Sequence, residues 1–251
     1  MGSYFSVQSE HYARNRPTYP DELFSFLSGL CENHELVWDC ATGNGQAAVS
    51  LSGYFKKVYA VDLSKEQISR AVQRENIFYK VESVEHSSLE TNSTDLITAA
   101  TAIHWFNIPK FYNEVHRVLK PNGVLAVWGY AGCKINPETD SILDDFAFNI
   151  LLNYWRPETK LNWEDKYETI NFPYPLIAAP EFQARAEYNF DDLIHYLNSW
   201  SSVQSYKEKN KTNPVDLIYP QLEKVWRDKN EIKKVSWDLF FKCGKKERVI
   251  R

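Results

Sequence analysis

The stretch VWDCATGNGQ, residues 37–46, decides the fold of this 251-residue chain. An apolar run ends there at Asp39, and a small residue and two glycines follow at every second position: Ala41, Gly43 and Gly45. A segment of helical character, 45–55, begins at the second glycine. Ligands of open α/β sheets sit beyond the carboxyl ends of the strands, where such a turn lies. Because glycine has no Cβ, the backbone of the turn can approach a ligand closely.

Strands and helices alternate from residue 20 to residue 130. We expect strands at 35–41, 57–64, 77–83, 95–102 and 123–130, and helices at 20–31, 45–55, 65–75 and 108–120. The near-continuous apolar and β-branched run at 95–102 is typical of a parallel strand that is covered on both faces. This alternation predicts an α/β protein with a doubly wound parallel sheet.

The pattern changes after the fifth strand. Residues 137–181 begin with a helical stretch at 141–155 and continue with many Trp, Tyr and Pro residues, which predicts a helical and aromatic cap insertion. Downstream we expect a strand at 182–190, a helix capped by Asp191, a helix at 214–228 and an antiparallel last strand at 235–246. The chain therefore reads as one domain, 1–251, with a Rossmann-like sheet of seven strands.

Composition excludes several classes of protein. The net charge of −4 and the absence of a basic stripe argue against nucleic-acid binding. No apolar run approaches the length of a membrane span. The four cysteines are far apart and form no CxxC pair, so we expect no metal site. Because no signal peptide is evident, we expect a cytoplasmic protein with free thiols.

Two acidic residues end the first two strands. Asp62 stands where a carboxylate can accept hydrogen bonds from both hydroxyls of a ribose; the alternative is a helix cap, for which Ser64 is better placed. Asp39 could hold a cationic amine directly or through water, or could cap the local backbone. The third glycine of the dinucleotide fingerprint is replaced by Ala48. The pattern favours a ligand with a ribose and a positive charge over a pyrophosphate.

Three motifs carry a family resemblance: VWDCATGNG (37–45), VYAVDLS (58–64) and EVHRVLKPNGVLAVWGY (114–130). In order and spacing the chain resembles the class I S-adenosylmethionine-dependent methyltransferases. More narrowly, it is similar to the type 11 small-molecule group related to trans-aconitate methyltransferase. The closer likeness rests on YARNRPTYP (12–20), AIHWF (102–106), YWRPETKLNWEDKYETINFPY (154–174) and LNSWSSVQSYKEKN (197–210). Ala41 departs from the family, which has glycine there.

The resemblance implies S-adenosyl-L-methionine as the cofactor and assigns residues to its parts. Ala41, Gly43 and Gly45 would line the methionine part, and Asp62 would hold the ribose. Leu63 would cover the adenine edge, Val84 and Glu85 would meet the adenine, and Thr101 would lie beneath the sulfonium. We also count Asp39 among the cofactor-binding residues, as the possible partner of an amine. Tyr12 and Arg16 belong to an N-terminal segment, 1–34, that would fold over the cofactor as a lid, and Arg16 could meet its carboxylate. The alternative is a surface arm with no contact.

The remaining predictions concern the molecule that accepts the methyl group and the residues around it. His104, just beyond the fourth strand, is the candidate catalytic base; the alternative is a histidine that orients Trp105 or a backbone carbonyl. The expected pocket residues are Trp105, Tyr130, Trp155, Arg156 and Trp200. We expect an O-methyltransferase of a small molecule, with a phenolic hydroxyl or a carboxylic acid as acceptor, acting as a monomer or weak homodimer. A cofactor-binding protein without catalysis and an N-methyltransferase of a small amine remain alternatives.

Overall fold

The computed structural model of the protein describes residues 17–247, apart from the side chains of residues 160, 161 and 163. Tyr12 and Arg16 lie outside these residues. The described strands form one seven-stranded sheet in the order β3-β2-β1-β4-β5-β7-β6. Their bounds are β1 Leu36–Cys40, β2 Lys57–Asp62, β3 Ile77–Val81, β4 Thr94–Ala100, β5 Leu119–Tyr130, β6 Phe182–Tyr188 and β7 Lys233–Lys245.

Five strands, β1 to β5, are parallel, which confirms the predicted doubly wound sheet. The chain proceeds outward from β1 to β3 and then returns to place β4 on the other side of β1. Val37 of β1 accordingly pairs with Val58 of β2 on one side and with Leu96 of β4 on the other. This reversal creates a switch point at the carboxyl ends of β1 and β4, where such sheets bind ligands.

The alternation of side chains along β1 supplies two cores. Val37 faces the core formed with α2 (Asp21–Leu30) and α3 (Gln46–Leu51). Its neighbour Trp38 faces the opposite core, formed with α5 (Ile108–Val118). Successive residues of a strand point to opposite faces, so a continuous apolar run is needed to fill both cores.

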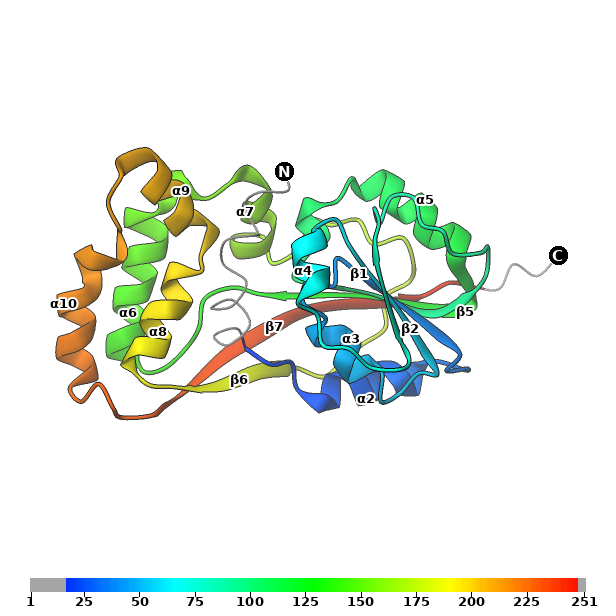
Figure 1. Ribbon diagram of the computed structural model, residues 1–251, viewed down its shortest axis with the longest axis horizontal. Helices are drawn as coiled ribbons and strands as arrows, with labels where there is room; N and C mark the ends of the chain where they lie inside the picture. The colour runs from blue at the N-terminus through cyan, green and yellow to red at the C-terminus, as the bar shows by residue number, and fades with distance from the viewer. Residues whose placement is uncertain (1–16, 248–251) are drawn as a thin grey trace.

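The last strand is antiparallel, as predicted, and it joins two parts of the molecule. The carboxyl half of β7 pairs with β5, and its amino half pairs with β6. Leu239 stands at the junction, opposite Tyr130 of β5 and Phe182 of β6. In Figure 1, β6 and β7 run from the sheet to a second group of helices.

This second group, here called the helical group, has an aromatic core of its own. It contains α6 (Pro137–Asp145), a π-helical turn (Phe146–Ile150), α8 (Phe190–Asn198), α9 (Ser201–Asn210) and α10 (Val215–Trp226). Its helices come from segments both before and after β6, whereas the cap insertion predicted from the sequence, 137–181, lies entirely before β6. A short helix, α7 (Pro157–Trp163), contacts the turn that follows β4. None of the described helices is long and apolar enough to cross a membrane.

Three details of the predicted helices were wrong. The helix expected at 45–55 is α3, Gln46–Leu51, because the amides of Gly53 and Tyr54 bond to carbonyls three residues back. The helix expected at 65–75 is α4, Lys65–Ser69, because the chain leaves it through tight bonds from the Arg70 and Ala71 amides to carbonyls three residues back. Asp191 does not cap α8. Asn189 does, in a reciprocal capping box with Asp192.

Candidate functional site

The turn after β1 has a left-handed backbone at all three positions of the glycine pattern. The φ angles are 52° at Ala41, 57° at Gly43 and 87° at Gly45. A Cβ at Gly45 would come within 2.1 Å of the Tyr79 hydroxyl, whereas a Cβ at Gly43 would meet no atom within 4 Å. Gly45 therefore serves packing within the protein, and Gly43 leaves its surroundings open for a ligand.

Asp39 supports this turn from below. It is fully buried; its Oδ2 accepts a hydrogen bond from Thr42 Oγ1 at 2.5 Å, and its Oδ1 accepts one from Thr98 Oγ1 at 2.8 Å. Burial raises the pKa of Asp39 to about 6, against the effect of these hydrogen bonds. The carboxylate ties the turn to β4, and its predicted contact with an amine stays a prediction.

Asp62 holds the turn from the neighbouring strand. Its Oδ2 accepts from the Gly43 amide at 2.9 Å, and its Oδ1 accepts from the Ser64 amide at 2.8 Å. Each carboxylate oxygen can accept a second hydrogen bond, so Asp62 keeps the capacity that the predicted contact with two ribose hydroxyls requires. Ser64 caps α4, as predicted, by accepting from the Gln67 amide. Leu63 is 71% exposed beside Asp62, which suits an apolar side chain that covers an adenine edge.

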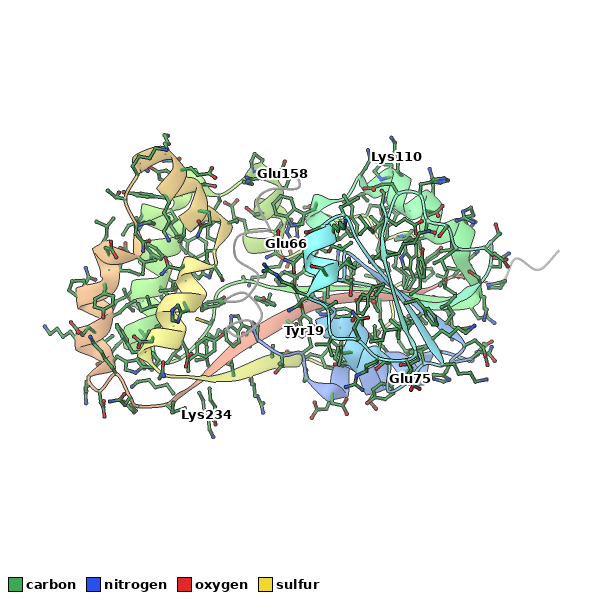
Figure 2. The ribbon with its side chains drawn as sticks, in the orientation of Figure 1. Tyr19, Glu66, Glu75, Lys110, Glu158 and Lys234 are labelled. Carbon is green, nitrogen blue, oxygen red and sulfur yellow. The ribbon has the colours of Figure 1, made fainter. Side chains whose placement is uncertain are left out.

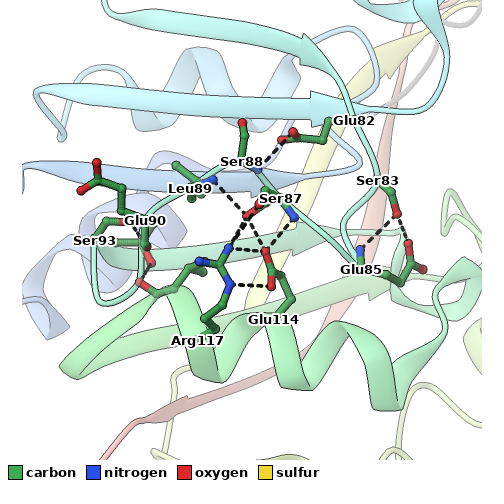
Figure 3. Close-up of polar contacts among 12 residues, drawn as sticks. Glu82, Ser83, Glu85, Ser87, Ser88, Leu89, Glu90, Ser93, Glu114 and Arg117 are labelled. Carbon is green, nitrogen blue, oxygen red and sulfur yellow. Dashed lines mark hydrogen bonds and ion pairs between the residues drawn. The ribbon is translucent and has the colours of Figure 1, made fainter.

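The loop after β3 is held by the burial of one residue and by hydrogen bonds of its neighbours. Val84 is buried, and Glu85 accepts hydrogen bonds from the Ser83 hydroxyl and, at 3.1 Å, from the Asn107 amide. Figure 3 shows the network beneath it, in which Glu114 accepts from the amide and the hydroxyl of Ser87, each at 2.7 Å. The two residues predicted to meet the adenine therefore lie on a loop with a fixed backbone.

Thr101 follows β4 with a φ of 52°, which is unusual for a β-branched residue. Its amide donates to the Trp128 carbonyl at 2.7 Å, and its hydroxyl lies 3.1 Å from the Tyr19 hydroxyl. The Tyr19 ring packs edge-on against Trp128, with centroids 5.5 Å apart, and contacts both the sheet core and the core of the helical group. In Figure 2, Tyr19 lies between these two parts.

His104 lies in the 3₁₀ turn Ile103–Trp105, three residues after Thr101. It is 9% exposed, and its Nδ1 lies 2.8 Å from the hydroxyl of Tyr167. Burial lowers the pKa of His104 to about 4, so the ring is neutral at neutral pH. The Trp105 ring lies beside it, with centroids 5.0 Å apart. Within the described part of the chain, His104 thus forms its hydrogen bond with a tyrosine of the cap segment.

The predicted pocket residues come from both sides of this turn. Tyr130, Trp155 and Trp200 share the aromatic core of the helical group, where Trp155 and Trp200 have centroids 5.7 Å apart. Tyr130 also approaches Tyr19, at 6.5 Å between centroids. Trp105 lies with His104 instead, and Arg156 is half-buried just before α7. The structure therefore groups three of the five and leaves the roles of all five as predictions.

Two residues of the site were missed in the sequence. Tyr19 lies in the segment RPTYP, whose rigid and aromatic character was a usable signal. Tyr167 lies in the aromatic cap segment, 63 residues from His104, and no local pattern indicated that contact.

Comparisons with known proteins agree with this geometry. The family described as "Methyltransferase domain" matches residues 38–127. A Dictyostelium discoideum protein named as a methyltransferase is 33% identical over 250 residues, covering 97% of this chain and 95% of that protein. The Saccharomyces cerevisiae protein CRG1, named as an S-adenosylmethionine-dependent methyltransferase, is 25% identical over 289 residues, covering 96% and 97%.

A solved structure gives the same result. The structure described as a type II methyltransferase from Anaeromyxobacter dehalogenans superposes with a TM-score of 0.86 and is 31% identical, over 92% of this chain and 98% of that one. The seven-stranded order β3-β2-β1-β4-β5-β7-β6 agrees with this likeness. The chain therefore belongs to the class I S-adenosylmethionine-dependent methyltransferases, and S-adenosylmethionine is its cofactor.

Proposed function

We propose that this enzyme is an O-methyltransferase of a small molecule, with a phenolic hydroxyl or a carboxylic acid as the acceptor. The observation that carries the proposal is the set of polar groups at the carboxyl end of β4. The hydroxyls of Thr101 and Tyr19 lie 3.1 Å apart there, and His104 follows with its ring nitrogen 2.8 Å from Tyr167. Such groups can bind and align an oxygen acceptor.

The cofactor supplies a methyl group that is already activated by a sulfonium. The protein's task is to align the acceptor with that methyl and to keep water away, and positioning alone can contribute much of the rate. In the proposal, Gly43 and Asp62 hold the cofactor, and Tyr19 and His104 border the acceptor. The aromatic residues Trp105, Tyr130, Trp155 and Trp200 supply its apolar surroundings. Arg156 is the candidate cation in the cap for an acidic acceptor.

Methyl transfer from isotopically labelled S-adenosylmethionine to a panel of small molecules tests this proposal. The panel contains carboxylic acids, phenols and amines of matched ring size, with products identified by mass spectrometry. We expect labelled esters or aryl ethers. Labelled amines alone would establish N-methyl transfer instead, and tight cofactor binding without any product would favour a binding protein. The expected cytoplasmic location, lid segment, and monomeric or weakly dimeric state stay predictions.

A further inference from the structure

The hydrogen bond between His104 and Tyr167 is held rigidly from the cap side. Tyr167 is 1% exposed, and its ring packs edge-on against Phe240 of β7, with centroids 4.9 Å apart. Tyr167 and the preceding Lys166 both have left-handed φ angles, 63° and 50°. Such a conformation costs free energy in a non-glycine residue and persists only where the surroundings enforce it. The position of the Tyr167 hydroxyl is therefore fixed relative to His104.

The direction of this hydrogen bond can be derived from what each group needs. A neutral imidazole has one N–H donor and one acceptor nitrogen, and a phenol has one O–H donor. Within the described part of the chain, His104 Nδ1 is the acceptor found for the Tyr167 hydroxyl. If Nδ1 carried the proton, the buried O–H would be left without that acceptor, and a buried donor without a partner is costly. The hydroxyl of Tyr167 therefore donates to Nδ1.

That direction fixes the tautomer of His104. A neutral ring that accepts at Nδ1 carries its proton on Nε2, since the hydrogen bond at one nitrogen determines the state of the other. Burial lowers the pKa of His104 to about 4, so the ring does not gain a second proton near neutral pH. His104 then offers a donor, and no free acceptor nitrogen remains to remove a proton from an alcohol or a phenol.

We propose that Tyr167 holds His104 as a hydrogen-bond donor, and that His104 binds one oxygen of a carboxylate acceptor rather than acting as a base. This inference rests on the proposed function and narrows its acceptor to an oxygen that is already ionised. Tyr167 is the positioning residue, and it comes from the cap segment. This donor role replaces the role of catalytic base that the sequence predicted for His104.

The chemistry of this step balances without a base. One carboxylate oxygen forms a bond to the methyl carbon while the bond from that carbon to sulfur breaks and its electron pair stays on sulfur. The products are a methyl ester and a neutral thioether, and no proton is released. A carboxylate has a second oxygen, which can accept from His104 Nε2 during the transfer. A neutral phenol would have to lose its proton, which this tautomer of His104 cannot accept.

The tautomer can be measured without any acceptor. ¹⁵N NMR of histidine-labelled full-length protein, with the His104 signals assigned by their loss in His104→Gln, distinguishes a protonated from an unprotonated ring nitrogen. We expect Nδ1 unprotonated and Nε2 protonated across the range from about pH 6 to about pH 8, well above the lowered pKa of the ring. Tyr167→Phe should produce a mixture of both tautomers. A proton on Nδ1 in the unchanged protein would overturn the proposal, whatever reaction the enzyme catalyses.

Three variants test the donor role in turnover of carboxylic acids. His104→Gln keeps an N–H donor, and His104→Leu removes it. Loss of a hydrogen bond to a charged group should lower kcat/KM of the leucine variant roughly 10- to 150-fold, with the glutamine variant within about tenfold of the unchanged enzyme. Tyr167→Phe should fall between them, with an unchanged affinity for S-adenosylhomocysteine as the folding control.

The outcomes separate the two levels of the proposal. Equal losses in the glutamine and leucine variants, or turnover of phenols but not of carboxylic acids, would overturn the donor role while leaving O-methyl transfer in place. If no oxygen acceptor is methylated, the proposed function and the acceptor class both fall, and the NMR experiment still decides the tautomer.

Discussion

Ala41 adopts a backbone conformation that favours glycine, with a φ of 52°. A left-handed conformation costs a residue with a Cβ roughly 1–2 kcal/mol. Ala41→Gly relieves this cost but makes the unfolded chain more flexible, which costs about 0.4–1 kcal/mol. We expect a net gain in the free energy of unfolding of about 0.5–1 kcal/mol, measured by urea denaturation. Ala48→Gly within α3 is the matched control and should destabilise. A loss of stability in Ala41→Gly would contradict this account of the turn.

Asp39 predicts a specific pH dependence of stability. Burial raises its pKa to about 6 in the folded protein from an ordinary value of 3.8, so between these pH values the folded state binds more protons than the unfolded state. The stabilisation from this group is present below about pH 4 and is lost as the pH rises through about 6. The difference between the two pKa values corresponds to roughly 3 kcal/mol of free energy of unfolding. Urea unfolding of Asp39→Asn should show a shallower decline over this range. If the free energy of unfolding changed with pH in the same way in both proteins, Asp39 would not be the source of the pH dependence.

Asp62 should account for much of the cofactor affinity. Two charge-assisted hydrogen bonds to a ribose contribute roughly 1.5–3 kcal/mol each. Asp62→Ala should weaken binding of S-adenosylmethionine by about one to several orders of magnitude in calorimetry. Asp62→Asn keeps one acceptor oxygen, so its affinity for S-adenosylmethionine should lie between those of the unchanged protein and the alanine variant. Because Asp62 also accepts from the Gly43 amide, part of the loss reflects a looser turn. Unchanged affinity in the alanine variant would contradict the ribose assignment.

The residues that the sequence identified and those it missed differ in how far apart along the chain their contacts lie. Ala41, Gly43 and Gly45 lie on one turn, and Asp62 ends the next strand, so strand order alone brings them together. The hydroxyl contacts of Tyr19 with Thr101 and of Tyr167 with His104 join residues 82 and 63 positions apart. Such pairs depend on where the cap and the N-terminal segment return to the sheet, which no local periodicity records.

At the scale of elements, α5 secures the loop after β3 that is predicted to meet the adenine. Glu114 of α5 forms two hydrogen bonds with Arg117, at 2.6 and 2.8 Å, besides its two bonds from Ser87 (Figure 3). Burial acts to raise the pKa of Glu114, but the bonds from Arg117 and Ser87 together outweigh it and lower the pKa to about 2, so the group is ionised at neutral pH. The helix thus presents an ion pair to the loop, since Arg117 also donates to the Ser87 carbonyl at 3.2 Å.

We predict that Glu114→Gln loosens this loop. A neutral amide cannot accept from Ser87 and pair with Arg117 as a carboxylate does. Hydrogen exchange followed by mass spectrometry should show faster exchange at 83–89, and calorimetry should show weaker cofactor binding, by roughly tenfold for a loss of about 1.4 kcal/mol. Glu158→Gln on the exposed start of α7, labelled in Figure 2, is the control. Unaltered exchange at 83–89 would show that the loop does not depend on this network.

Element identity was predictable because the central parallel strands β1, β4 and β5 are buried on both faces over most of their length. The ends of the elements depended instead on local hydrogen bonds. The helix expected at 65–75 ends at Ser69. Just beyond the predicted end of that helix, Asn76 donates its side-chain amide to the carbonyls of Ser52 and Phe55, which holds the chain beside the segment that follows α3. The helix α9, Ser201–Asn210, has weak amphipathic character and was not identified as a separate helix. Hydrophobic periodicity cannot record either feature.

At the scale of the whole molecule, β7 is the strand that both parts share. Trp237 in its amino half belongs to the core of the helical group and donates to the Tyr196 hydroxyl of α8 at 2.8 Å. Cys243 in its carboxyl half belongs to the sheet core beside α2 and α3. Tyr19 contacts both cores as well. Unfolding of the helical group alone would leave half of a thirteen-residue strand without its packing.

This sharing predicts one cooperative unit in which a ligand at the sheet protects the helical group. S-adenosylhomocysteine at about 100 times its Kd should stabilise the folded state by about 2.7 kcal/mol. Native-state hydrogen exchange should show that increase in peptides of α8 and α10 as well as in those of β1 and β4, since all open through the same global unfolding. Protection confined to the sheet would mean that the helical group unfolds separately. In that case Tyr167, which packs in the sheet core beside α5, would keep its contact with His104 while the helical group opens.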